Sequence, residues 1–497
     1  MVNKPKVPFY SLPDPDLNFL ASDSGLYDYG HLYAYALQFQ RITEEQLPEN
    51  SPVIFLSDSS DSLCFAIASC WLLGVPFTTL TPNQTDSELN NVLSRLNARA
   101  VFTDYKNSQR VENYWHLLIP EPENDQISYK IPESFSDHSP EELLGTFATS
   151  GSTGAPKLVP LKRRQMLFAA KASEDNFRPD RNRYWLLCLP LNHVGGISII
   201  IRSILYYSAI YRMDRFDEYQ VATFMEENKL FQVASLVPTM LHRLLENPIF
   251  KTHKEFKTIL LGGGPISQAL LKKANIRGVP VVSSYGMTET CAQIAANPLT
   301  KPSGLYIPVK SVGTVFSPNR AEIRSDSGNT LSANNSGTIW LKGPQVFEGY
   351  VDEADNTGKF DKEGWFNTGD YGHMNATGQL FIETRRTDLI ISGGENINPR
   401  EVESALEEIA HVGQAAVIGA PDEKWGQRVV AFIEPTTGEK PDAETILTEV
   451  KKKLPGYKVP KEIILSDALP RTESGKVKKS VLLKMIAETN GSGSNDY

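Results

Sequence analysis

The feature that most constrains the fold is an alternation of short and long apolar segments near the N-terminus. Short runs at 53–56, 77–80 and 100–103 have the length of buried strands, and the intervening segments 62–73 and 89–96 have helical character. In the second helical segment the apolar residues recur at i, i+3, i+4 and i+7, on one helical face. Strands separated by helices are typical of βαβ units, so we expect a mostly parallel sheet. Further strands are predicted at 184–189, 233–237 and 258–261.

The pattern changes after residue 312, where short strands between Gly and Asn turns predict a small antiparallel part. A boundary is expected at 385–388. Beyond it, Asn398 as N-cap, Pro399 at the first helical position and Glu401 three residues after the cap predict the start of a helix. We therefore expect an α/β plus α+β protein. It comprises a large N-terminal domain of layered αβ subdomains with a small antiparallel β part (1–385), a small α+β C-terminal domain (386–490) and a disordered tail (491–497).

The composition excludes several classes of protein. The chain has 497 residues, 40% hydrophobic and 22% charged, enough for a large core and two or more domains. A net charge of −9 without a long Lys/Arg cluster argues against a nucleic-acid partner. The longest apolar run, 194–210, contains Arg202 and falls short of the ~20 residues of a membrane span, so a buried helix is expected. No secretory signal is recognised, and four cysteines without a C-x-x-C pair predict reduced thiols in the cytoplasm.

The stretch 149–157 (TSGSTGAPK) concentrates hydroxyls, glycines and a lysine. Such a loop suits a polyphosphate, because glycine lets backbone N–H groups approach closely. It is not a Walker A loop, since Ala155 and Pro156 separate the last glycine from Lys157. Taken alone, the stretch has a second interpretation as a polar surface loop.

Two further segments carry carboxylates suited to a nucleotide. Segment 284–290 (SYGMTET) follows a predicted strand and contains Glu289, which suits Mg²⁺ beside a phosphate or, alternatively, caps the next helix. Segment 367–370 (NTGD) offers a carboxylate at a tight turn that fits ribose hydroxyls, and its alternative is a plain Asx-turn.

Two C-terminal segments complete the set. Segment 385–403 combines an arginine, a Gly-Gly pair and a capped helix, which suits a loop pressed against a ligand, although the glycines also fit ordinary turns. Segment 469–476 (LPRTESGK) ends in Lys476, which domain motion can carry into a distant site. Its alternative is a surface lysine.

Together the five segments, in this order and spacing, resemble the adenylate-forming superfamily of acyl-CoA synthetases, luciferase and peptide-synthetase adenylation domains. The resemblance extends over roughly residues 51–483. It implies a mobile C-terminal domain that caps the large domain and rotates between two half-reactions, formation of an acyl-adenylate with release of pyrophosphate and transfer of the acyl group to CoA. The implied ligands are ATP, Mg²⁺, CoA and a small carboxylic acid. Monomer and homodimer both stay open.

The resemblance also assigns roles to residues. The loop that handles the β- and γ-phosphates of ATP would be Ser150, Gly151, Ser152, Thr153, Gly154 and Lys157. Thr288 and Glu289 would contact the α-phosphate and Mg²⁺, and Asp370 and Arg385 would bind the ribose. The adenine and acyl pockets would be lined by Gly262, Gly263, Gly264, Ser284, Tyr285 and Gly286.

The remaining roles concern the reacting groups. Lys476 would bridge the carboxylate and the α-phosphate, where an ammonium offsets developing charge. His193 would gate the acyl pocket, and Gly393 and Gly394 would line the pantetheine tunnel. Two positions depart from the family pattern: Leu158 replaces the usual glycine after Pro-Lys, and the hinge falls on Thr387 or Asp388.

Four segments resemble the o-succinylbenzoate–CoA ligases of menaquinone biosynthesis: 189–202, 235–241, 260–265 and 284–294. That acid carries two carboxylates, and the one that is not activated needs a cation. Arg202 is the candidate, beside His193 and Ser284 as further substrate residues, because an unpaired arginine in an apolar segment is costly and a guanidinium suits a carboxylate. The alternative for Arg202 is a structural ion pair with an acidic neighbour.

Other functions remain compatible with the sequence. A CoA ligase for another aryl or fatty acid would share the five segments, although a fatty-acid pocket would not need Arg202. A stand-alone enzyme that loads a carrier protein would require the carrier in trans, since no attachment segment follows Lys476. A non-catalytic relative would be expected to lack Lys476 or Glu289, and both are present.

Overall fold

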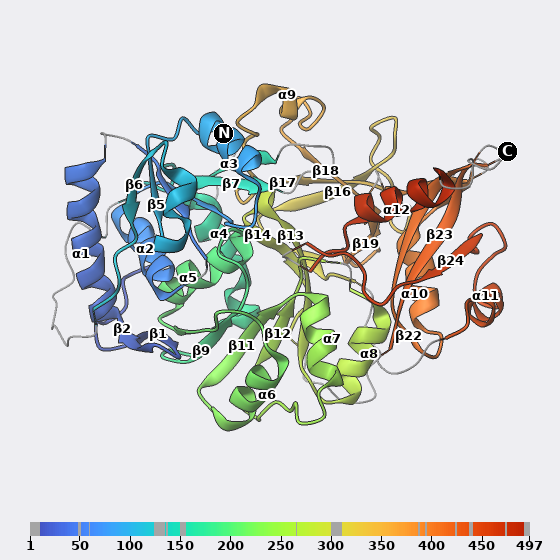
Figure 1. Cartoon of the computed structure of the whole chain (residues 1–497), viewed down its shortest axis with the longest axis horizontal. Coiled ribbons are helices and arrows are strands. Elements are labelled where there is room, and N and C mark those ends of the chain that lie inside the picture. The colour runs from blue at the N-terminus through green and yellow to red at the C-terminus, as the bar shows by residue number, and fades with distance from the viewer. Residues whose placement is uncertain are drawn as a thin grey trace.

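The computed structural model describes residues 10–47, 51–58, 60–123, 135, 138–149, 156–264, 266–299, 311–385, 388–392, 395–422, 425–436, 441–472 and 475–491. Several predicted site residues lie outside these ranges: the phosphate-loop residues 150–155, the Gly393–Gly394 pair and the hinge candidate Thr387. For Arg385 only the backbone is described. Figure 1 shows a large N-terminal part and a smaller C-terminal part, coloured orange to red, beside it.

The predicted βαβ alternation near the N-terminus is confirmed. In the described part of the chain, six strands form a sheet of order β6-β5-β3-β4-β7-β8, parallel except for β8. The strands are β3 (Val53–Leu56), β4 (Phe77–Leu80), β5 (Ala100–Thr103), β6 (Trp115–Leu118), β7 (Leu143–Thr149) and β8 (Lys157–Lys162). The connecting helices include α2 (Asp61–Leu73) and α3 (Asp86–Arg95), preceded by α1 (Tyr29–Gln46).

A second sheet has the order β15-β14-β13-β12-β11-β9-β10-β1-β2 among the described residues. Its inner strands are parallel and pair side by side. The bounds are β1 (Asn18–Ser22), β2 (Gly25–Asp28), β9 (Tyr184–Leu187), β10 (Ala209–Arg212), β11 (Phe231–Leu236), β12 (Thr258–Leu261), β13 (Val281–Met287), β14 (Ala292–Ala296) and β15 (Thr314–Val315).

Helices cover both faces of this sheet. One face packs on α6 (Glu218–Glu227), α7 (Pro238–Glu246) and α8 (Gln268–Ile276), the lower green helices of Figure 1. The other face shares one continuous core with the six-stranded sheet, to which α2, α4 (Arg163–Phe177) and α5 (Val194–Tyr206) contribute. Because apolar side chains on both sides of these helices are buried, the two sheets are held in a fixed relation.

The apolar run 194–210 is only partly the single buried helix that the sequence predicts. Helix α5 ends at Tyr206, because Tyr207 adopts the left-handed conformation with φ of 55°. The chain then enters β10 at Ala209. The prediction was therefore right for the first part of the run and wrong for its last residues, where periodicity alone does not separate a buried helix from a buried strand.

A buried ion pair joins helix α2 to the nine-stranded sheet. Asp61 in the first turn of α2 pairs with Arg212 at the end of β10, and their side chains are 8% and 6% exposed. Ser22 donates to the same carboxylate over 2.7 Å. Asp214 accepts a further hydrogen bond from the guanidinium over 2.6 Å. Two strands of this sheet and one helix therefore depend on a charge pair that is shielded from water.

We expect Arg212→Ala to lower the free energy of unfolding by about 3–5 kcal/mol, because it leaves Asp61 buried without its partner. Urea unfolding measures the change. The matched control is Arg181→Ala, which breaks an exposed pair with Asp14 (side chains 59% and 68% exposed) and should cost less than about 1 kcal/mol. Equal losses in the two variants would contradict a special role for the buried pair.

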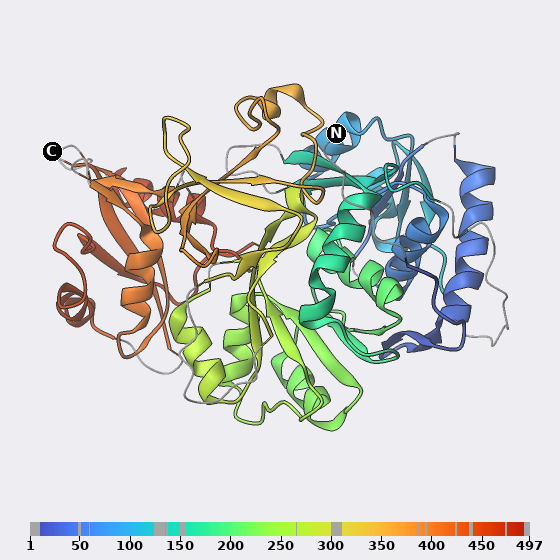
Figure 2. The ribbon, with the colours of Figure 1, turned by 180° about the vertical axis from the view of Figure 1, so that it is seen from behind.

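The predicted antiparallel part is a four-stranded sheet of order β16-β17-β18-β19 within the described residues. It consists of β16 (Arg320–Arg324), β17 (Gly337–Lys342), β18 (Phe366–Met374) and β19 (Leu380–Arg385), with the short helix α9 (Glu353–Asn356) between β17 and β18. Figure 2 shows this sheet, in yellow and orange, between the N-terminal sheets and the C-terminal part.

The C-terminal part is an α+β unit with its own core. Its described strands are β20 (Ile390–Ser392), β21 (Glu395–Ile397), β22 (Val412–Asp422), β23 (Gly426–Pro435) and β24 (Glu462–Leu465), and its helices are α10 (Pro399–Glu407), α11 (Ala443–Lys451) and α12 (Lys479–Gly491). Gly491, assigned to the disordered tail from the sequence, is instead the last residue of α12. No helix among the described residues combines the length and apolar character needed to cross a membrane.

The start of α10 follows its sequence signals with one difference. The Asn398 side chain accepts a hydrogen bond from the Arg400 N–H over 2.9 Å, and Pro399 occupies the first turn. Glu401 does not turn back to the cap. Its two carboxylate oxygens lie 2.6 and 2.7 Å from Nζ of Lys458. An ion pair within the C-terminal part therefore takes the place of the expected cap interaction.

Candidate active site

Several of the predicted site residues follow the carboxyl ends of strands in the nine-stranded sheet. Strands β9, β11, β12 and β13 are parallel, so their carboxyl ends lie side by side. The chain leaving them carries His193, the helix start at Val237, the Gly262–Gly264 turn and the Thr288–Thr290 turn. Ligands of open α/β sheets bind at this edge. The fold therefore brings together groups that lie far apart in the sequence.

The glycine turn after β12 packs against β13. Ser284 Oγ donates to the Leu261 carbonyl over 3.0 Å, and a Cβ on Gly262 would lie 2.8 Å from that hydroxyl. Gly263 has φ of +75°, which favours glycine. Position 286 needs a glycine for a different reason. A Cβ on Gly286 would lie 2.0 Å from the Ala292 carbonyl oxygen of β14. Close pairing of β13 and β14 alone requires a glycine there.

A direct hydrogen bond joins the second and third sequence segments. Tyr285 donates its hydroxyl to Asp370 Oδ2 over 2.6 Å, and Asp370 is 6% exposed. Asp370 lies inside β18 rather than at the tight turn that we predicted. The Asx-type bond in this segment is made by Asn367, which accepts from the Gly369 N–H over 3.0 Å. The backbone of Arg385 is the register partner of Asp370 on β19.

Glu289 is held from a segment that the sequence did not single out. Its Oε1 accepts a hydrogen bond from the Tyr350 hydroxyl over 2.7 Å, and its carbonyl accepts from the Phe347 N–H over 2.8 Å. Glu289 is thus held by these bonds, and its second carboxylate oxygen has no described hydrogen-bond partner. No sequence signal marks Tyr350, because a tyrosine after glycine fits no motif.

Lys157, the last residue of the predicted phosphate loop, lies beside the same tyrosine. Its Nζ is 4.9 Å from the centroid of the Tyr350 ring and 2.8 Å from Asp355 Oδ1 of α9. The backbone carbonyl of Pro156 accepts from Arg95 over 2.7 Å, and Arg95 also pairs with Asp352. The strand that leaves the loop is therefore anchored to α3 and α9.

The two substrate candidates on α5 have different surroundings. His193 is the N-cap residue, and its carbonyl accepts from the N–H groups of Gly196 and Ile197 at 3.0 and 3.2 Å. Arg202 lies nine residues further along, about 13 Å deeper along the helix axis. Its side chain is fully buried.

Arg202 forms no ion pair with any described carboxylate, which contradicts the structural alternative considered from the sequence. Its Nε and Nη2 atoms are buried without a hydrogen-bond partner, and its guanidinium lies 6.0 Å from the Phe177 ring centroid. Burial lowers the pKa of Arg202, and the nearby hydroxyls of Tyr206 and Tyr10 and the thiol of Cys291 oppose that shift. A buried guanidinium with open donors is suited to an anion.

The Lys476 loop of the C-terminal part reaches the same edge of the sheet. The Gly475 N–H, just before Lys476, donates to the Thr472 carbonyl over 2.9 Å. A Cβ on Gly475 would lie 2.7 Å from Thr239 Oγ1 and 3.3 Å from Val237. Val237 is also the neighbour of Gly263. The loop that carries the exposed Lys476 and the glycine turn after β12 therefore both contact Val237.

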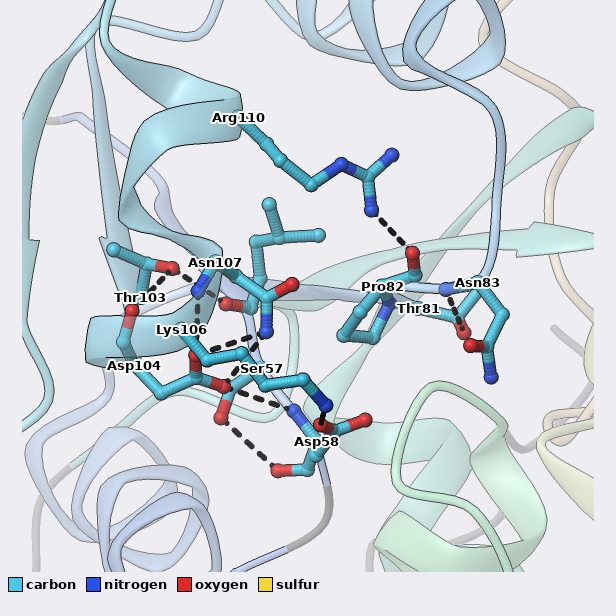
Figure 3. Close-up of polar contacts among 11 residues, drawn as sticks. Ser57, Asp58, Thr81, Pro82, Asn83, Thr103, Asp104, Lys106, Asn107 and Arg110 are labelled. Carbon is cyan, nitrogen blue, oxygen red and sulfur yellow. Dashed lines mark hydrogen bonds and ion pairs between the residues drawn. The ribbon is translucent and has the colours of Figure 1, made fainter.

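A second polar cluster lies at the carboxyl ends of β3, β4 and β5 (Figure 3). Asp104 accepts from the Asn107 backbone and side chain at 2.9 and 2.8 Å, and Lys106 lies 2.9 Å from Asp58. Arg110 donates to the carbonyls of Pro82 and Gln84. The groups satisfy one another and hold three loops together, so we assign this cluster to stability.

The fold and site define a class of nucleotide-dependent enzyme. A family model of AMP-binding enzymes matches residues 14–351, and a model of the AMP-binding enzyme C-terminal domain matches residues 401–476. The chain therefore belongs to the AMP-binding enzyme family.

Individual relatives are more specific. The chain is 34% identical over 433 residues to a 2-succinylbenzoate–CoA ligase of Enterococcus faecalis, covering 87% of this chain and 88% of the relative. It is 37% identical over 357 residues to the enzyme of that name from Listeria monocytogenes, covering 72% and 73%. A solved structure of o-succinylbenzoate CoA synthetase from Bacillus subtilis with its acyl-adenylate intermediate superposes with a TM-score of 0.83 at 29% identity, covering 94% of this chain and 95% of that one.

Proposed function

We propose that this protein is an ATP-dependent, AMP-forming acid–CoA ligase that acts on o-succinylbenzoate. The acid would first form an acyl-adenylate with release of pyrophosphate, and the acyl group would then pass to the thiol of CoA. Two relatives with this activity in their names cover most of the chain. The observation that carries the choice of acid is Arg202, buried in an apolar helix with two nitrogen atoms unpartnered. A dicarboxylate supplies the anion that this group lacks.

The proposal gives each polar group at the sheet edge a task. Asp370, oriented by Tyr285, would accept hydrogen bonds from the ribose hydroxyls, and Arg385 would donate hydrogen bonds to the ribose oxygens. Lys476 would lie between the acid and the α-phosphate. Thr288 would contact the α-phosphate and Glu289 would hold Mg²⁺. The second carboxylate oxygen of Glu289 fits a hard cation that takes one or two carboxylates in addition to phosphate oxygens. When bound, Mg²⁺ neutralises charge on the phosphates.

The remaining assignments rest on the family resemblance. We propose that residues 150–154 wrap the β- and γ-phosphates, that His193 gates the acyl pocket, and that Gly393 and Gly394 line a tunnel for pantetheine. The domain boundary would fall at 385/386, and the C-terminal domain would turn about Thr387 or Asp388 between the two steps. We propose the cytoplasm as the location. A monomer and a homodimer are both compatible with this scheme.

Acid-dependent release of AMP with ATP, Mg²⁺ and CoA tests the proposal. The acids compared are o-succinylbenzoate, benzoate, 4-coumarate, acetate and palmitate. We expect kcat/KM for o-succinylbenzoate to exceed that for benzoate by about 10²-fold or more, because a site built around a buried charge rejects analogues that leave it unpaired. Preference for another acid would overturn the substrate and keep the ligase chemistry. Adenylation without thioester formation would favour a carrier protein as acceptor.

A further inference from the structure

We propose that Tyr350 is a positioning residue that holds Glu289 and Lys157 in a fixed relation, so that both act on one triphosphate. The inference rests on the proposed function, because it takes Glu289 as the carboxylate for Mg²⁺ and Lys157 as a phosphate ligand. It goes further by naming what aligns two groups that lie more than one hundred residues apart in the sequence.

Tyr350 contacts both groups with different parts of its side chain. Its hydroxyl donates to Glu289 Oε1 over 2.7 Å, and its ring face lies 4.9 Å from Lys157 Nζ. The residue is 7% exposed, so water competes weakly for either contact. Lys157 has a second contact, in which its Nζ lies 2.8 Å from Oδ1 of Asp355. Asp355 is on α9, the short helix that follows Tyr350 in the chain.

The backbone around Tyr350 is fixed to both of the elements that it joins. On one side, the Val351 N–H donates to the Leu158 carbonyl of β8 over 3.0 Å. On the other, Gln345 Nε2 donates to the Thr290 carbonyl over 2.8 Å. The Tyr350 N–H itself donates to Asn356 Oδ1 over 2.7 Å. The segment 345–351 therefore links the strand after the phosphate loop to the turn that carries Glu289.

This arrangement has a chemical consequence for each group. A hydrogen bond to Oε1 fixes the carboxylate and leaves Oε2 for a cation, and such outer partners typically alter metal affinity by about 10–100-fold. A lysine over an aromatic face is attracted to it without using up its N–H donors. Lys157 can therefore stay on the ring while it donates to phosphate oxygens.

The test is Tyr350→Phe, which keeps the ring and removes the hydroxyl. We expect the free Mg²⁺ concentration for half-maximal pyrophosphate release to rise about 10-fold at saturating ATP and acid. Formation of the thioester from preformed acyl-adenylate and CoA should keep its wild-type rate, because that step uses neither the triphosphate nor its cation. Tyr350→Leu, which also removes the ring, should additionally raise KM for ATP.

The control is Tyr33→Phe, which removes a buried hydroxyl that donates to the Pro13 carbonyl over 2.7 Å, on α1 away from the sheet edge. It should leave the Mg²⁺ requirement unchanged. An unchanged requirement in Tyr350→Phe beside a raised one in Glu289→Gln would overturn the positioning role and spare the proposed function. No rise in Glu289→Gln would instead remove the metal role of Glu289, and the inference with it. Equal loss of both half-reactions in Tyr350→Phe would mean that the tyrosine is merely structural.

Discussion

Lys476→Ala is expected to slow acyl-adenylate formation by about 10²–10³-fold, the usual cost of removing a group that stabilises developing charge. Transfer of the acyl group from preformed adenylate to CoA is expected to stay near the wild-type rate. In the first step the carboxylate displaces pyrophosphate from a negatively charged phosphorus centre, and an ammonium between the two reactants offsets their repulsion. The second step begins after pyrophosphate has left and needs no such bridge.

The position of the Lys476 turn supports this division of labour. Gly475 packs on Thr239 at the start of α7, beside the glycine turn that follows β12. In the structure, the residue before Lys476 therefore lies at the carboxyl edge of the large sheet. Under the proposed rotation of the C-terminal domain, the same loop would leave this edge and expose it to CoA.

Single-turnover measurements of the two half-reactions check the prediction, with Lys478→Ala as the matched control. Lys478 lies two residues further along the chain, is exposed, and carries the same charge. The charge of Lys478 contributes to the lowered pKa of Glu88, after the stronger backbone and side-chain hydrogen bonds from Thr85. Its removal should leave adenylation within about 2-fold of wild type, since exposed charges contribute little. Equal loss of both half-reactions in Lys476→Ala would contradict the assigned role.

The sequence predicts the fold well wherever periodicity and length agree. The strands 53–56, 77–80, 100–103 and 258–261 lie where the pattern placed them, because each is a short apolar run between turn residues. The run 194–210 contains both the end of a helix and the start of a strand. Helix and strand are equally apolar there, and the break at Tyr207 is a left-handed residue for which the sequence offers no glycine or proline.

The sequence indicates the segments of the candidate site but not the contacts between them. Segments that combine glycine, hydroxyls and carboxylates are recognisable in the sequence, because few structural roles other than ligand binding require these residues together. The pairing of Tyr285 with Asp370, and of Glu289 with Tyr350, depends on how separate sheets meet, which no local pattern encodes. The choice between the alternatives for Glu289, Asp370 and Arg202 depends on which atoms lie near each side chain, and the sequence does not give these neighbours.

Arg202→Met is expected to weaken binding of the acid without lowering the stability of the free enzyme. We expect KM for o-succinylbenzoate to rise about 10²-fold, since removing one member of a buried charge pair costs about 2–5 kcal/mol in a complex. KM for ATP should stay within about 2-fold. Without acid the variant should unfold at the same temperature as the wild type or higher, because replacing a buried unpaired charge by an apolar side chain of similar length removes a desolvation penalty.

Arg163→Met provides the contrast. Arg163 is also buried, and burial lowers its pKa to about 10, but its Nη1 donates to the Trp71 carbonyl over 2.8 Å and its guanidinium lies 3.9 Å from the Trp71 ring. Its donors are used inside the protein, so its loss should lower the unfolding temperature and leave KM for the acid unchanged. If Arg202→Met instead behaved like Arg163→Met, Arg202 would be a structural group. The second carboxylate of the acid would then be recognised elsewhere.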